Sequence, residues 1–148
     1  MTSHWSTGRR ILVGTAIAGT LDILAAICLT LYFGRKVLGM LRFVASGPFP
    51  GAMTWGDAGA ALGLAVHYAL MAIMVTVFVL AADRMPQLKR QPILWGVLYG
   101  LATYVVMNLV VTPLRFGSPL PPSTLSIATQ LFCHIVLVGI PIALVARK

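Results

Sequence analysis

The sequence predicts an all-α protein, a single membrane domain that crosses the bilayer four times, up-down-up-down, as a four-helix bundle. Of its 148 residues, 59% are hydrophobic and 9% are charged, whereas a soluble domain has roughly 25% charged residues. The apolar residues form four blocks, and each is long enough to cross about 30 Å of hydrocarbon as a helix. The segments between the blocks are too short for a separate soluble domain, so residues 1–148 are expected to form one unit.

Each apolar block is expected to be one transmembrane helix. The first block is too long for a cleaved signal peptide and ends at Arg35-Lys36, so we expect it to be retained. The short connection after the second block places the second and third helices antiparallel and side by side. The predicted spans cover about residues 11–33, 59–82, 93–114 and 123–145.

The connection between the first two spans, about residues 34–58, is the longest. Its first part either extends the first helix or forms a separate helix along the membrane interface. The run Gly47-Pro48-Phe49-Pro50-Gly51 then ends any helix, because proline has no backbone N–H to donate. We expect a loop at the membrane surface, with a lid over the mouth of the bundle as the alternative.

The basic residues stand at the ends of the apolar blocks. There are eleven Lys and Arg and three Asp and Glu, for a net charge of +8. At block ends such residues meet anionic lipid headgroups, so we expect contact with lipids and no binding of nucleic acid. Seven of them lie on the side of the two termini and four on the opposite side, which we call the outer side. This asymmetry predicts a bacterial inner-membrane protein with both termini in the cytoplasm.

Small and polar residues recur every four positions in each block, so they share one face of each helix. Small residues at this spacing let helices approach closely in lipid. The four ridges are Gly14-Ala18-Asp22-Ala26, Gly59-Gly63-His67-Met71, Gly96-Gly100-Tyr104-Asn108 and Ser126-Gln130-His134-Val138.

The ionisable residues of these ridges lie at similar depths. Counted from the outer ends at 1.5 Å per residue, Asp22 and His134 are roughly 16 Å deep and His67 is roughly 12 Å deep. An ionised carboxylate facing lipid at that depth costs at least about 2.5 kcal/mol. We therefore expect one intramembrane cluster, made of Asp22, His67 and His134 with Tyr104, Asn108 and Gln130 around them.

Several interpretations of this cluster stay open. Its hydrogen bonds, worth about 0.6 kcal/mol each, can hold helices together without any chemistry. Chains of Asp and His inside membranes also mark proton paths, which favours a role in proton handling. Alternatively, His67 and His134 ligate a haem b, or hold a metal or a quinone, in a subunit of a larger membrane complex. A small transporter or channel subunit that works as a homo-oligomer is a further alternative.

The chain lacks the usual signatures of enzymes. It contains no glutamate, no H-E-x-x-H, no P-loop and no nucleophile elbow. We expect no catalysis, no metal site and no resident cofactor. The two cysteines, Cys28 and Cys133, fall within the spans and are typical of small buried hydrophobic residues.

A series of spaced motifs runs through about the last hundred residues. They are His67, Met85-Pro86-x-Leu88-Lys89, Gly96-x-x-x-Gly100, Asn108, Thr112-Pro113-Leu114, Gly117-Ser-Pro-Leu-Pro121-Pro122 and His134. This pattern resembles that of small bacterial inner-membrane proteins of the YagU type, whose function is uncharacterised. The resemblance implies a four-helix inner-membrane fold and no established reaction. The type is loosely associated with acid tolerance, which favours proton handling.

Overall fold

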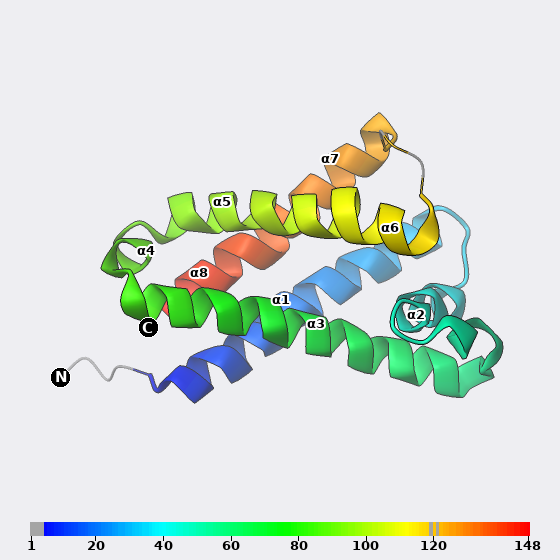
Figure 1. Cartoon of the computed structure of the whole chain (residues 1–148), viewed down its shortest axis with the longest axis horizontal. Coiled ribbons are helices and arrows are strands. Elements are labelled where there is room, and N and C mark those ends of the chain that lie inside the picture. The colour runs from blue at the N-terminus through cyan, green and yellow to red at the C-terminus, as the bar shows by residue number, and fades with distance from the viewer. Residues whose placement is uncertain (1–4, 119, 121) are drawn as a thin grey trace.

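The structure is a computed structural model that describes residues 5–118, 120 and 122–148. The described chain is all α, and four long helices pack as a bundle (Figure 1). Their mean hydropathy lies between 1.8 and 2.3, and each is long enough to cross a membrane. The predicted fold class is confirmed, and the chain is a small multi-pass membrane protein.

Each of the four spans overlaps one predicted block. The first two are single helices, α1 (Thr7–Tyr32) and α3 (Gly56–Arg84). The third consists of α5 (Pro92–Tyr104), the π-helical stretch η2 (Val105–Val111) and α6 (Thr112–Phe116). The fourth consists of α7 (Thr124–Phe132), the π-helical stretch η3 (Cys133–Gly139) and α8 (Ile140–Ala146). Three short helices lie in the connections: α2 (Val37–Ser46), η1 (Pro50–Thr54) and α4 (Pro86–Arg90).

Both π-helical stretches precede a proline, Pro113 after η2 and Pro141 after η3. A proline ring inside a helix clashes with the carbonyl four residues earlier. A wider turn moves this carbonyl away from the ring. Before Pro113, the hydroxyl of Thr112 also donates to the carbonyl of Met107 at 2.7 Å. Wide turns of this kind are frequent at functional sites. Here they carry Asn108 and His134, two residues of the predicted cluster.

The helix α2 lies across the bundle. Figure 1 shows α2 almost end-on, whereas the four spans run across the picture. Of the two arrangements expected for this stretch, the structure has the separate helix. It packs tightly on α3. The carbonyl oxygen of Leu41 lies so close to Gly63 that there is no room for a Cβ at that position. The glycine ridge of the second span therefore seats α2.

Glycines also bring the third and fourth spans together. A Cβ on Gly96 would lie 2.8 Å from the Cα of Ile140, and a Cβ on Gly100 would lie 2.6 Å from the Cα of Ile135. Gly139, which is not part of a predicted ridge, faces both glycines from the fourth span. A larger residue at any of these positions would push the two backbones apart.

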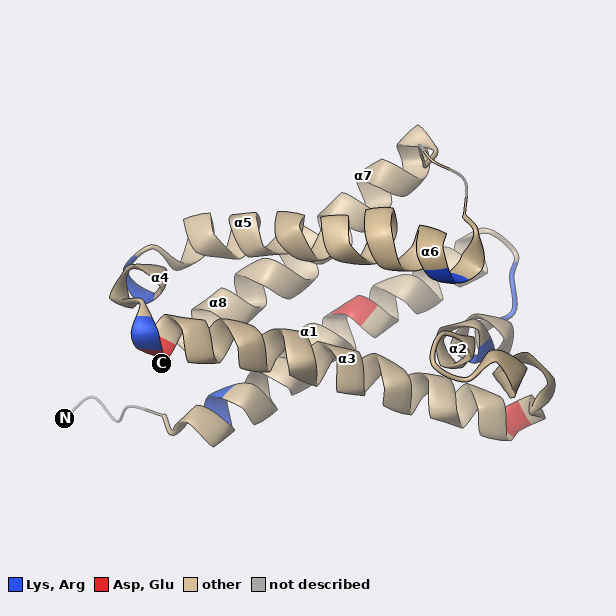
Figure 2. Cartoon of the chain, in the orientation of Figure 1, with Lys and Arg blue, Asp and Glu red and all other residues tan. Residues whose placement is uncertain are grey.

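The half of the bundle near the termini is densely packed. Its core includes Val75 and Val79 from α3 and Val138 and Ile142 from the fourth span, all at most 1% exposed. Lys and Arg gather at the two ends of the bundle, while the acidic position on α1 lies between the ends (Figure 2). In the outer half, α2 packs on α3 and is bonded to α6 through Arg115.

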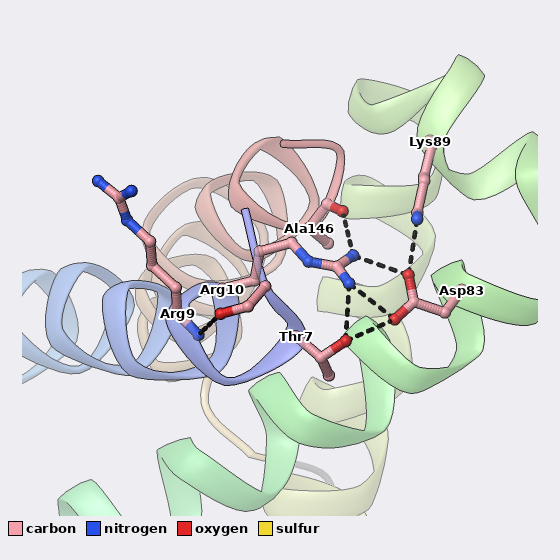
Figure 3. Close-up of polar contacts among 7 residues, drawn as sticks. Thr7, Arg9, Arg10, Asp83, Lys89 and Ala146 are labelled. Carbon is pink, nitrogen blue, oxygen red and sulfur yellow. Dashed lines mark hydrogen bonds and ion pairs between the residues drawn. The ribbon is translucent and has the colours of Figure 1, made fainter. Parts of the chain in front are cut away.

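An ion-pair network joins the helix ends on the side of the termini (Figure 3). The carboxylate of Asp83 accepts hydrogen bonds from both terminal nitrogens of Arg10, at 2.8 and 2.7 Å, and from Lys89 at 2.6 Å. The same guanidinium donates to the carbonyl of Ala146 and the hydroxyl of Thr7, both at 3.0 Å. Arg10 is only 5% exposed. The network thus connects three of the four spans and α4.

Replacing Asp83 with Asn should destabilise the bundle. The change leaves the buried guanidinium of Arg10 without its counter-ion, and we expect the free energy of unfolding to fall by about 2 kcal/mol. Titration with SDS in mixed micelles measures this. The control is Asp57→Asn, at the exposed outer end of α3, which should change stability by less than about 0.5 kcal/mol. Equal stability of the two variants would contradict the assignment.

Candidate functional site

A cavity of about 370 Å³, which we call the central cavity, lies between the spans on the outer side of the packed core. Its polar lining includes five of the six residues predicted to cluster. The sixth, Tyr104, is buried against His134, with ring centroids 6.1 Å apart. A functional role for these residues stays a prediction. The five lining residues are Asp22, His67, Asn108, Gln130 and His134.

The first polar group joins α1 to α3. The imidazole Nε2 of His67 lies 2.8 Å from the carbonyl oxygen of Gly19. Because a carbonyl only accepts hydrogen bonds, Nε2 carries a proton, and Nδ1 is the nitrogen that can gain or lose one. Nδ1 lies 4.0 Å from Oδ2 of Asp22. The exchangeable nitrogen of His67 therefore faces the carboxylate.

A glycine makes this approach possible. A Cβ on Gly19 would lie 2.7 Å from Cε1 of Tyr68, so a larger residue would force the ring of Tyr68, next to His67, to shift. The hydroxyls of Tyr68 and Thr20 share a hydrogen bond of 2.9 Å beside it. Sequence reasoning missed Gly19. The available signal was the pair of small residues Ala18-Gly19, one turn before Asp22.

The second polar group joins the third and fourth spans. The hydroxyl of Thr103 donates to the carbonyl of Gly100 at 3.0 Å, so it must accept from Nδ1 of His134, at 3.1 Å. The other nitrogen, Nε2, is then free to accept from the amide of Asn108 at 3.1 Å. Every donor has an acceptor when His134 is neutral. Sequence reasoning missed Thr103, since it lies beside the predicted ridge and not on it.

The structure therefore arranges the predicted residues in two groups around a common cavity. Asp22 and His67 stand on the wall made by α1 and α3, and Asn108 and His134 on the wall made by η2 and η3. In the described part of the chain, no hydrogen bond joins the two groups. Gln130 lines the cavity from α7.

The two histidines as placed do not fit haem ligation. Bis-histidine ligation takes one ring nitrogen from each side of the haem. His67 has Nδ1 open, but both nitrogens of His134 are engaged by Thr103 and Asn108, so the second ligand is missing. Within residues 5–118, 120 and 122–148, no three His, Cys, Asp or Glu side chains stand close enough to hold a metal ion.

Two further hollows adjoin the central cavity. The outer vestibule, about 560 Å³, lies between α1, α2 and α7, and its polar lining includes Arg35, Ser123 and Ser126. It shares Phe43 and Gln130 with the central cavity. The central cavity thus adjoins a polar hollow at the outer end of the bundle.

The lateral groove, about 460 Å³, lies between α2 and α3 on one side and η2 and α6 on the other. Its lining is mainly apolar. The guanidinium of Arg115 closes its outer end by donating to the carbonyls of Gly47, at 2.6 Å, and Ser46, at 2.8 Å. The rings of Phe43 and Phe116 stack below, with centroids 4.3 Å apart. These contacts hold α2 over the outer half of the bundle.

Comparison of the chain with protein-family models, with curated proteins and with solved structures gave no match. The resemblance to the YagU type thus rests on the spaced sequence motifs alone.

The two histidines should behave differently as the pH changes. His67 should keep its proton on Nε2, and any further proton should bind at Nδ1. His134 should be present as the neutral Nδ1–H form, because each of its nitrogens already has a partner. Nitrogen NMR of histidine-labelled protein in bilayers measures both, with His67→Gln and His134→Gln to assign the signals. A neutral His134 protonated on Nε2 would show that the proposed network is wrong.

Proposed function

We propose that this chain is a small multi-pass protein of the bacterial inner membrane that binds a proton at Asp22 and His67 and so couples its state to the pH on the outer side. The observation that carries this proposal is the exchangeable Nδ1 of His67, 4.0 Å from the Asp22 carboxylate on the wall of the central cavity. The pair offers two places for one proton, in direct electrostatic contact.

The polar groups in the cavity divide into a titrating pair and a structural group. The Asn108–His134–Thr103 chain has all its donors and acceptors satisfied, and it joins the third and fourth spans. We assign it the role of holding these spans. The Asp22–His67 pair, by contrast, has a free Nδ1 and an incompletely buried carboxylate, with 27% of the Asp22 side chain exposed. Proton exchange is therefore assigned to this pair.

The packing of the bundle supports access of protons to Asp22 and His67 from one side of the membrane only. Towards the termini, the fully buried Val75, Val79, Val138 and Ile142 fill the space between the spans. Towards the outer side, the central cavity adjoins the polar vestibule at Gln130. The excess of Lys and Arg on the side of the termini favours a cytoplasmic location for both. The proton then reaches the pair from the side of the membrane opposite the cytoplasm. The association of the YagU type with acid tolerance agrees with this direction.

Infrared difference spectra between acid and neutral pH test the proton site. The spectrum of the protein in bilayers should contain the carbonyl band of a carboxyl group that becomes protonated in acid. Asp22→Asn should remove this carboxyl band, because it replaces the carboxyl group that takes up the proton. Asp57→Asn, the same change at the exposed start of α3, should leave it in place. A band that persists unchanged in Asp22→Asn would refute the proposal.

The same band tests the side of access. In sealed vesicles that hold the protein in one orientation, acidifying the side opposite the termini should produce the band. Acidifying the side of the termini alone should not. The reverse dependence would show that protons pass the packed core instead of the vestibule.

A further inference from the structure

We propose that the central cavity and the lateral groove together bind a lipophilic organic cation, with its charge beside Asp22 and its apolar body in the groove. This inference rests on the proposed function, because the cation and the proton would use the same carboxylate. It adds the chemical class of a ligand to that site.

The two hollows adjoin each other. With volumes of about 370 and 460 Å³, each lies within the usual range for small-molecule sites. The same side chains line both of them, so a ligand that displaces these side chains can extend from one hollow into the other. The shared residues are Phe43, Val44, Leu70, Met107 and Thr112.

The charges around the space favour a cation over an anion. Asp22 is the sole acidic residue lining any of the three hollows in the described chain. The ends of α3 carry Asp57, Asp83 and Arg84. The titratable side chains near Asp22 are His67 and Tyr68 on α3 and Cys133 and His134 on η3. None of these carries a permanent positive charge. An anion in the cavity would be repelled by the Asp22 carboxylate, whereas a cation would neutralise it.

The arginines of neighbouring elements do not point their charge at Asp22. Arg42 on α2 donates to the carbonyl of Gly56 at the outer end of α3, 3.4 Å away. Arg115 on α6 donates to the carbonyls of Ser46 and Gly47 at the outer end of the groove. Arg35 lines the vestibule, not the central cavity. The negative charge of Asp22 is thus available to a ligand.

The remaining lining suits the body of such a ligand. The thioethers of Met71, Met74 and Met107 and the ring of Phe43 line the central cavity. Methionine side chains are flexible and polarizable, and an aromatic face attracts a cation. The groove is lined by apolar side chains, and some of them are exposed. Phe43 is 44% exposed and Val111 is 39% exposed. On the lipid-facing flank of the bundle, these residues open the groove to the bilayer.

Access from lipid also avoids the charge at the outer end. Four basic residues, Arg35, Lys36, Arg42 and Arg115, lie on that side together with one acid, Asp57. They disfavour the approach of a cation from water. A lipophilic cation that enters the groove from the membrane meets only one of these four, Arg115, whose guanidinium is bonded to the carbonyls of Ser46 and Gly47 at the outer end.

Proton and cation compete at this site. A cation beside Asp22 favours the ionised carboxylate and a neutral His67, so its binding releases up to one proton. By linkage, the affinity for the cation falls as the proton binds, that is, as the pH is lowered. Binding of the ligand is therefore coupled to the pH of the outer side.

The test uses tetraphenylphosphonium and tetraphenylborate, ions of similar shape and opposite charge, with the full chain in lipid nanodiscs and isothermal titration. We expect the phosphonium to bind and the borate not to. Asp22→Asn should weaken binding of the phosphonium by at least about tenfold, and Asp57→Asn should leave it unchanged. Val66→Trp, which fills the groove away from Asp22, should also weaken it while the pH-dependent carboxyl band remains.

Two results would overturn the proposal: equal affinity of the wild type and Asp22→Asn for the phosphonium, or equal affinity of the wild type for both ions. Infrared spectra of the same samples separate this failure from failure of the proton site. If the Asp22 band responds to pH but not to the phosphonium, the proton-binding function stands and the cation site falls. If Asp22→Asn leaves the band unchanged, the proton-binding function itself falls.

Discussion

The ion pair between Arg10 and Asp83 is the contact on which the shape of the bundle depends. A guanidinium that is 5% exposed stays charged inside a protein only where hydrogen bonds replace its hydration. Asp83, Thr7 and the carbonyl of Ala146 supply them from three spans. With these ends joined and an apolar core packed above them, the spans can diverge on the outer side. The space so created is occupied by α2 and by the cavities.

Glycines decide how the spans meet on either side of that space. The third and fourth spans touch backbone to backbone at Gly100, which puts Asn108 of one wide turn within reach of His134 in the other. The first and second touch at Gly19, whose carbonyl accepts from His67. The two histidines thus have different roles although they are the same residue type. A donor faces Nε2 of His134, and an acceptor faces Nε2 of His67, so only His67 has a nitrogen left for proton exchange.

The cavities give the proposed proton site its surroundings. Asp22 lines the central cavity, which adjoins a polar vestibule at the outer end and an apolar groove between α2, α3, η2 and α6. The helix α2 borders all three hollows through Phe43, and Arg115 attaches it to α6. One carboxylate is therefore placed where water and lipid-soluble molecules could both reach it, while the packed core separates it from the side of the termini.

The sequence by itself determined the number, class and approximate bounds of the spans. These follow from the thickness of the hydrocarbon layer, which requires about 20 apolar residues in a row, a property of neighbouring residues. It also identified Asp22, His67, Asn108 and His134 as inward-facing, since a four-residue repeat marks one face of a helix. Only the tertiary structure decided that these residues form two groups, that Gly19 and Thr103 complete them, and that α2 lies across the bundle. Such contacts depend on the rotation and crossing of helices distant in sequence, which a repeat within one helix does not specify.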